Sequence, residues 1–143
     1  MKRILVVLAL MLLALGLSGC KKTTAPEESS GPIRASVVLG TWNYDENGYQ
    51  LASADMGSHV TTDEAEYRSL KTLISGIQMD MTETDYTFLT GYLITLYTPE
   101  GEPESQLLVG TTHELASRDG LVFTAQSLAP VRQKLSALLE ANQ

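Results

Sequence analysis

The stretch ASVVLGTWNY, residues 35–44, indicates the fold class of this chain, because half of its residues are β-branched or aromatic, the types enriched in strands. The residues DENG, 45–48, follow it, and Tyr49-Gln50-Leu51 come next. Within them Asn47-Gly48 is a strong signal for a tight turn between two strands. We therefore predict that the domain opens with a β-hairpin and then passes through a loop of small and polar residues, 52–59.

A helix is predicted next, over about 62–75. Thr61 with Glu64 three residues later forms a capping box, which is a signature of a helix start. The apolar residues that recur at helical spacing are Tyr67, Leu70, Leu73, Ile74 and Ile77. Gly76 is placed to end the helix.

Beyond Gly76 the apolar period changes from about 3.6 to 2, which is typical of half-buried strands. Strands are predicted over 77–82, 86–90, 92–98, 106–115 and 121–125. The turns between the later ones are Pro99–Pro103 and Ser117–Gly120, and Gly91 is predicted to be a bend or bulge. Pro130 suits the first turn of a final helix, whose apolar stripe is Val131, Leu135, Leu138 and Leu139.

Together these elements predict a mainly β domain with one inserted helix and one C-terminal helix. Six or seven consecutive strands form an antiparallel meander. We expect the meander to close into a small β-barrel, because closure is the arrangement that removes unpaired strand edges most fully.

The first predicted strand carries Gly40-Thr41-Trp42, which resembles the Gly-x-Trp signature of the lipocalins. The order strand, helix, meander is similar to that of small lipocalin-like domains in bacterial lipoproteins. The resemblance implies that Trp42 packs across the floor of the barrel. It also implies an arginine from late in the chain above this ring, for which Arg118 and Arg132 are the candidates.

The N-terminal residues predict export and lipidation. Lys2 and Arg3 precede an unbroken apolar run from Ile4 to Leu17, shorter than the roughly 20 residues that a membrane-spanning helix needs. Leu17-Ser18-Gly19-Cys20 then resembles the lipobox of bacterial lipoproteins, which implies cleavage before Cys20 and acylation of its sulfur. We therefore expect a cleaved signal peptide, 1–19, a lipidated cysteine with a polar tether, 20–33, and a single lipocalin-like domain, 34–143.

A lipidated Cys20 implies a location in the bacterial cell envelope, anchored in a membrane. Because Lys21, the second mature residue, is not aspartate, the resemblance implies the outer membrane, facing the periplasm, in a Gram-negative organism. In other bacteria it implies the outer face of the cell membrane. The chain carries a formal charge of −7, with 10 basic and 17 acidic residues. This acidity argues against binding of nucleic acid, which needs a clustered positive face.

Residues suited to catalysis or metal binding are few and scattered. His59 and His113 have no metal-site spacing, and the acidic group Asp80, Glu83 and Asp85 lacks the calcium-binding loop pattern. The serines at positions 36, 58 and 117 have no nucleophile elbow around them. We therefore predict a protein without enzymatic activity, metal or cofactor.

Two functions fit these observations. The first is a membrane-anchored binding module that takes a small apolar or amphipathic ligand into the barrel. Its candidate lining residues are Tyr86, Phe88, Tyr92, Ile94, Leu96, Val109 and Phe123. The second is an envelope protein–protein interaction module, an assembly partner or inhibitor, with a solid barrel core. It would bind through an open sheet edge or through two loops, Ala52–His59 with Met56 and the acidic Pro99–Glu104.

Overall fold

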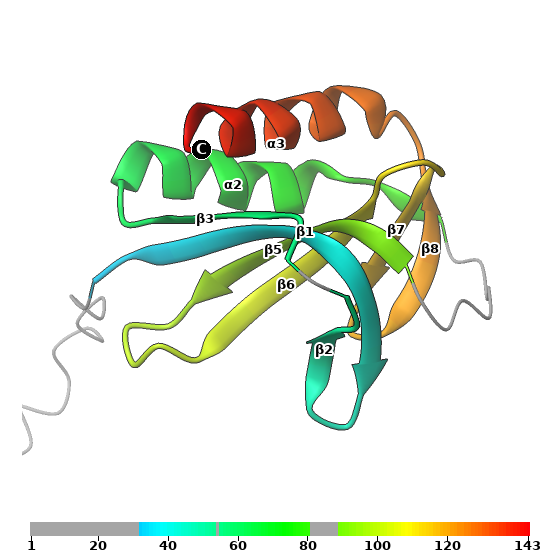
Figure 1. The fold of residues 1–143 in the computed structure, drawn as a ribbon, viewed down its shortest axis with the longest axis horizontal. Helices are drawn as coiled ribbons and strands as arrows, with labels where there is room; N and C mark the ends of the chain where they lie inside the picture. The colour runs from blue at the N-terminus through cyan, green and yellow to red at the C-terminus, as the bar shows by residue number, and fades with distance from the viewer. Residues whose placement is uncertain (1–31, 54, 81–88) are drawn as a thin grey trace, which may run out of the picture. The chain divides into compact units, whose positions relative to one another are not determined.

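An antiparallel sheet of eight strands is the main element of the described chain, and two helices cover one of its faces (Figure 1). The structure is a computed structural model that describes residues 32–53, 55–80 and 89–143, all within one unit, 31–143. In chain order the elements are β1 (Arg34–Asp45), β2 (Gly48–Leu51), β3 (Gly57–Thr61), α2 (Glu64–Gly76), β4 (Met79–Asp80), β5 (Leu89–Tyr97), β6 (Pro103–Gly110), β7 (Leu115–Arg118), β8 (Leu121–Ala125) and α3 (Ala129–Ala141). The predicted mainly β class with two helices is confirmed.

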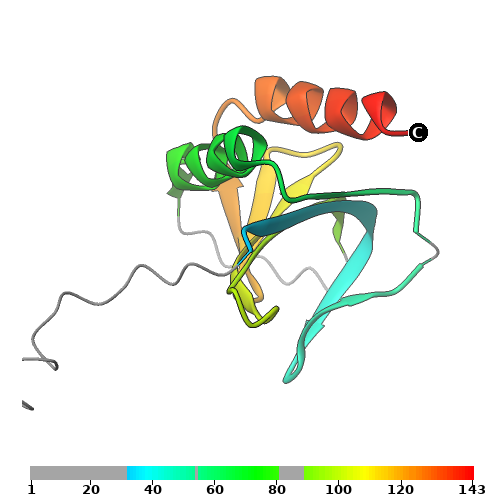
Figure 2. The same cartoon turned by 90° about the vertical axis from the view of Figure 1, so that its left-hand side faces the viewer.

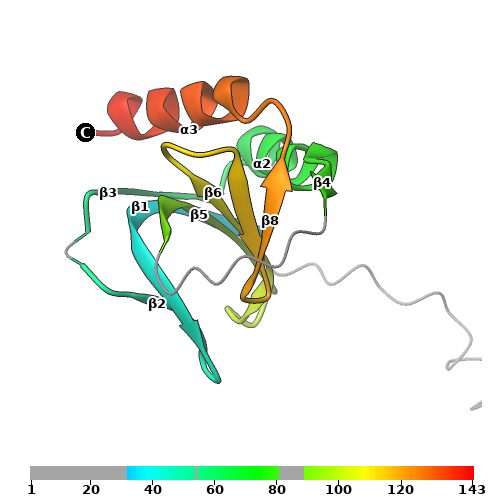
Figure 3. The same ribbon diagram turned by 90° about the vertical axis from the view of Figure 1, so that its right-hand side faces the viewer.

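The strands lie in the order β2-β1-β5-β6-β7-β8-β4, and β3 pairs with β1 on the same side as β2. Among the described residues, β5 to β8 follow one another as a meander of four strands, where six or seven were predicted. Helix α2 carries the chain from β3, at one edge of the sheet, to β4, at the opposite edge beside β8 (Figure 3). Among the described residues no strand pairing joins these two edges, so the sheet is open and the predicted barrel is not confirmed.

Both faces of the sheet are apolar. On β5, Ile94 and its alternate neighbours face the helices and pack against Leu70 of α2 and Leu135 of α3. Leu93 lies on the other face, in a smaller cluster with Trp42 and Leu108. This two-sided burial explains why β5 reads as an almost continuous apolar run instead of a strict alternation.

Three glycines line up across the middle of the sheet. Gly40 of β1 pairs with Gly91 of β5, which pairs with Gly110 of β6. By strand alternation this row lies on the face of Trp42, whose indole Nε1 donates a hydrogen bond of 3.2 Å to the carbonyl oxygen of Gly91. Strand β1 turns sharply along its length (Figure 2).

Gly91 is thus inside a strand and not between two strands. The sequence predicted separate strands over 86–90 and 92–98, whereas residues 89–97 form the single strand β5. Residues 86–88 lie outside the described residues. The irregularity in the pairing of β5 with β6 falls instead between Leu96 and Tyr97.

Two further strand predictions were wrong in extent. Residues 106–115 were predicted as one strand, but β6 ends at Gly110 and β7 begins at Leu115. Residues 57–61, assigned in part to a loop over 52–59, form β3. Strand β4 lies within the predicted 77–82, and β8 matches the predicted 121–125.

The start of helix α2 also differs from the prediction. Asp63, and not Thr61, is the N-cap, because its carboxylate accepts a hydrogen bond from the backbone N–H of Glu66. Thr61 stabilises the turn before the helix, since its hydroxyl oxygen accepts a hydrogen bond of 3.1 Å from the N–H of Asp63. The final helix, α3, has its proline in the first turn and buries Leu135 and Leu139, as predicted.

The glycine row gives a paired stability prediction. A Cβ added at Gly91 would lie 2.3 Å from the backbone oxygen of Val109, which cannot move without breaking the β5–β6 pairing. A Cβ at Gly40 would clash with the tip of the Leu51 side chain, which is 39% exposed, and would lie at an ordinary contact distance of 3.7 Å from the Trp42 indole nitrogen. We expect Gly91→Ala to lower the free energy of unfolding by about 3 kcal/mol and Gly40→Ala by less than about 1 kcal/mol. Urea unfolding of the domain from Gly31 onward measures both, and equal losses would contradict the close approach of the β6 backbone to Gly91.

Candidate functional site

The structure describes five of the seven predicted ligand-lining residues. Those on β5 and β6, namely Tyr92, Ile94, Leu96 and Val109, lie buried in the core between the sheet and the helices. Phe123 is half-buried on β8, opposite Ala116 of β7. Tyr86 and Phe88 lie outside the described residues. A ligand among the core residues would have to displace the helices.

The opposite face of the sheet is filled by side chains as well. Trp42, the predicted barrel-floor residue, is buried there with Leu93 and Leu108, and Tyr49 packs on this cluster from β2. The Tyr49 hydroxyl lies 2.8 Å from the hydroxyl of Ser117 on β7 and accepts a hydrogen bond from the N–H of Gly120. Burial raises the pKa of Tyr49, and these two hydrogen bonds oppose the rise.

The two ends of the curved sheet therefore meet through side chains. The Tyr44 ring stands edge-on to the Tyr49 ring, with centroids 4.9 Å apart, and it packs so closely on Gly120 that a Cβ there would lie 2.2 Å from it. Asp119 and Gly120 both have positive φ, as the two-residue turn between β7 and β8 requires. These contacts bring the β1–β2 hairpin against the β7–β8 turn without a backbone ladder.

The arginine expected above Trp42 is bonded elsewhere. Arg118 donates to the carbonyl oxygen of Ile74 in α2. Arg132 donates to the carboxylate of Glu114 at 2.9 Å and to the carbonyl oxygen of Gly110. The cation–ring contact among the described residues is Arg34 over Tyr97, at 4.4 Å from the ring centroid.

Glu114 links the β6–β7 connection to the start of α3. One carboxylate oxygen accepts from the backbone N–H of Leu128, the N-cap residue of α3, and the other accepts from Arg132. The first of these bonds is the main reason that the pKa of Glu114 is lowered, and the second adds to it. Because the folded pKa is depressed, this contribution to stability is present above the unfolded pKa and is lost as the pH falls through the folded pKa.

We therefore expect Glu114→Gln to reduce stability at pH 7 and to cost less at pH 3, which lies below the ordinary pKa of a glutamate, so that part of the contribution of the charge is already lost in the wild type. Chemical unfolding at the two pH values measures this difference. Glu100→Gln, in the exposed β5–β6 loop, is the control and should change neither value. An equal loss for Glu114→Gln at both pH values would contradict the role of the charge.

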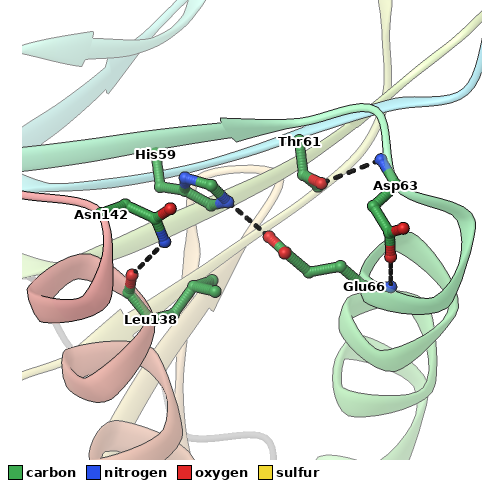
Figure 4. Close-up of polar contacts among 6 residues, drawn as sticks. All are labelled: His59, Thr61, Asp63, Glu66, Leu138 and Asn142. Carbon is green, nitrogen blue, oxygen red and sulfur yellow. Dashed lines mark hydrogen bonds and ion pairs between the residues drawn. The ribbon is translucent and has the colours of Figure 1, made fainter.

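A second polar cluster ties β3 to α2 (Figure 4). His59 Nε2 lies 2.5 Å from Glu66 Oε1, and the two side chains are 13% and 29% exposed. Beside them Asn142 donates to the carbonyl oxygen of Leu138 at the end of α3. The neighbouring serine, Ser58, points to the other face of the strand, so the pair is not joined to a nucleophile.

The other residues that the sequence analysis considered for catalysis or metal binding make structural contacts, are exposed or lie outside the described residues. Ser36 shares a hydrogen bond with the Tyr97 hydroxyl, Ser117 bonds to Tyr49, and His113 and Asp80 are exposed. Glu83 and Asp85 lie outside the described residues. Within residues 32–53, 55–80 and 89–143, no group of three or more histidine, cysteine, aspartate or glutamate side chains is placed to hold a metal ion.

The surface feature that stands out is the sheet edge formed by the return strand, residues 48–61, which comprises β2, β3 and the connection between them. Leu51, Met56 and Val60 along it are 39%, 58% and 56% exposed. The sequence predicted Met56 as a contact residue in a loop. It did not predict that residues 57–61 form an edge strand or that Val60 is exposed. The acidic loop Pro99–Glu104 is exposed at the β5–β6 hairpin.

A groove runs between the two helices. It has two parts, of about 450 Å³ and about 260 Å³, which share Ser69, Leu73 and Lys134. Val131 lines the larger part and Leu138 the smaller. The walls are mainly apolar, and sequence periodicity could not find the groove because it depends on how far apart the helices lie.

Within the described part of the chain, no helix is long and apolar enough to cross a membrane. Comparisons with protein-family models, with curated proteins and with solved structures gave no match. The lipobox and the lipocalin-like signature therefore stay predictions from the sequence.

Proposed function

We propose that this protein is a cell-envelope lipoprotein, held at a membrane through Cys20, whose domain is a non-enzymatic module that binds another envelope protein. The anchor rests on the basic start, the apolar run 4–17 and the resemblance of residues 17–20 to a lipobox. Two acyl chains on the cysteine are enough for stable attachment. The domain would therefore meet its partners at the membrane surface.

The observation that carries this proposal is the contrast between the faces of the sheet and its edge. An apolar cluster of described residues packs on each face, one around Ile94 and one around Trp42. The return strand, in contrast, exposes Met56 and Val60 to more than half of their full area. Packed clusters favour the solid-core alternative, and an exposed apolar edge favours contact with a protein.

Photo-crosslinking in the cells that make the protein tests this proposal. A photoreactive amino acid is placed at Met56, or at the exposed positions Lys71 on α2 and Leu121 beside the β7–β8 turn, in the full-length lipidated chain. We expect a discrete adduct with another protein, in lower yield when Cys20→Ser removes the anchor. Absence of a protein adduct at all three positions would overturn the proposed function.

The groove between α2 and α3 favours a second candidate, a small apolar or amphipathic ligand. Its walls include Leu73 and Val131, and Lys134 at its rim could hold an anionic group. This site differs from the barrel interior that the sequence suggested.

Native mass spectrometry of the domain purified from Gly31 onward tests this second candidate. If the groove carries a ligand, a reproducible small mass should accompany the wild type and disappear in Leu73→Trp, because the larger side chain fills the groove. Lys71→Trp, on the same helix but outside the groove lining, should retain it. A protein without any added mass would leave this candidate unsupported.

A further inference from the structure

We propose that β3 accepts an extended, lysine- or arginine-flanked segment of the partner protein as an added strand of the sheet. This inference rests on the proposed function and specifies the partner's chemistry and its mode of binding. The segment would lie along residues 57–61 and continue the sheet beyond β3.

The backbone of β3 offers unpaired groups on its outer side. The N–H of Met56 donates to the carbonyl oxygen of Leu39, so the backbone groups of Leu39 point toward the return strand. Since backbone groups alternate along an antiparallel strand, those of Gly57, His59 and Thr61 face β1, and those of Ser58 and Val60 face outward. In the described chain no strand pairs with β3 on that side, and such a row of donors and acceptors is a template for strand addition.

The edge lacks the side chains that usually prevent such pairing. Residues 48–61 contain no lysine, arginine or proline, which are the residues that natural sheets place on exposed edges. The opposite edge strand, β4, has two described residues, and Asp80 is exposed there. Of the two edges as described, β3 is the longer.

The strand is also held in place before a partner arrives. Pairing with β1 fixes one side, and the contact between His59 and Glu66 fixes β3 to α2. A Cβ at Gly57 would lie 3.5 Å from the side chain of Leu139, so α3 covers the strand closely as well. A fixed edge loses little conformational freedom on binding, which favours association.

Charges at the two ends of β3 indicate which segment fits. Asp55 precedes the strand and Asp63 follows it, and both are exposed. The whole chain has 17 acidic and 10 basic residues, so a second copy of the domain would be repelled. An extended segment with apolar side chains beside Val60 and with cationic residues at its ends is complementary to this edge.

The test uses the photoreactive residue at Met56 in the full-length lipidated chain, with substitutions at neighbouring positions. Ser58→Pro removes one outward N–H and places a ring in the path of the added strand, while the β1 pairing stays intact. We expect the adduct yield to fall at least tenfold in Ser58→Pro and to be unchanged in Ser58→Thr, which keeps the N–H.

Two further variants keep the inference testable if Ser58→Pro does not fold. Val60→Lys places a cation on an exposed edge position and should lower the yield by a similar factor. Asp55→Asn removes a charge but keeps an oxygen that can accept the hydrogen bond from the N–H of Gly57. We expect it to lower the adduct yield severalfold, and this loss would measure the effect of the charge alone. Mass spectrometry of the adduct should identify a segment with lysine or arginine beside its apolar residues.

The other outcomes separate this inference from the proposed function. A protein adduct at Met56 that Ser58→Pro and Val60→Lys leave unchanged, or adducts only at Lys71 or Leu121, would overturn strand addition and leave the protein-binding function standing. A crosslinked segment that is acidic, a lipid adduct, or a second copy of this chain would also overturn the inference. Absence of any protein adduct would overturn both.

Discussion

The packing of the Trp42 indole on the face of the sheet away from the helices is the interaction on which the two-sided packing of the sheet depends. The ring is buried on this face, and its Nε1 donates a hydrogen bond of 3.2 Å to the carbonyl oxygen of Gly91. An aromatic ring of this size buries a large area in one step. The face away from the helices thereby gains a core of its own, with Leu93 and Leu108.

That second core accounts for how the two ends of the open sheet meet. A barrel closes by a backbone ladder between its first and last strands, whereas here Tyr44 and Tyr49 bridge to Ser117 and Gly120 by ring packing and hydrogen bonds. Side-chain contact of this kind fixes the hairpin against the turn without pairing the strand edges. Among the described residues the outer edge of β3 therefore stays without a strand partner.

The sequence predicted those elements whose signals are local. The Asn47-Gly48 hairpin, the amphipathic helix after residue 61 and the proline at the start of α3 each depend on residues close together in the chain, and all three are present. Strand β3 was missed because Gly57 and Ser58 have little strand preference of their own, and they become a strand only by pairing with β1, about twenty residues earlier. The continuity of β5 through Gly91 was missed for a related reason, since the need for glycine there comes from the close approach of the neighbouring strand β6.

The candidate edge was only partly visible in the sequence for the same physical reason. Exposure of Met56 could be anticipated from its polar surroundings, but that of Val60 could not, because its face is set by the register of β3 on β1. An exposed edge is also a liability, and three features of this chain limit it. The strand is only five residues long, the connection between Leu51 and Met56 interrupts it, and the acidic chain repels its own copies. These features leave the backbone groups of Ser58 and Val60 available while disfavouring unselective pairing, which is the combination that a selective strand-addition site requires.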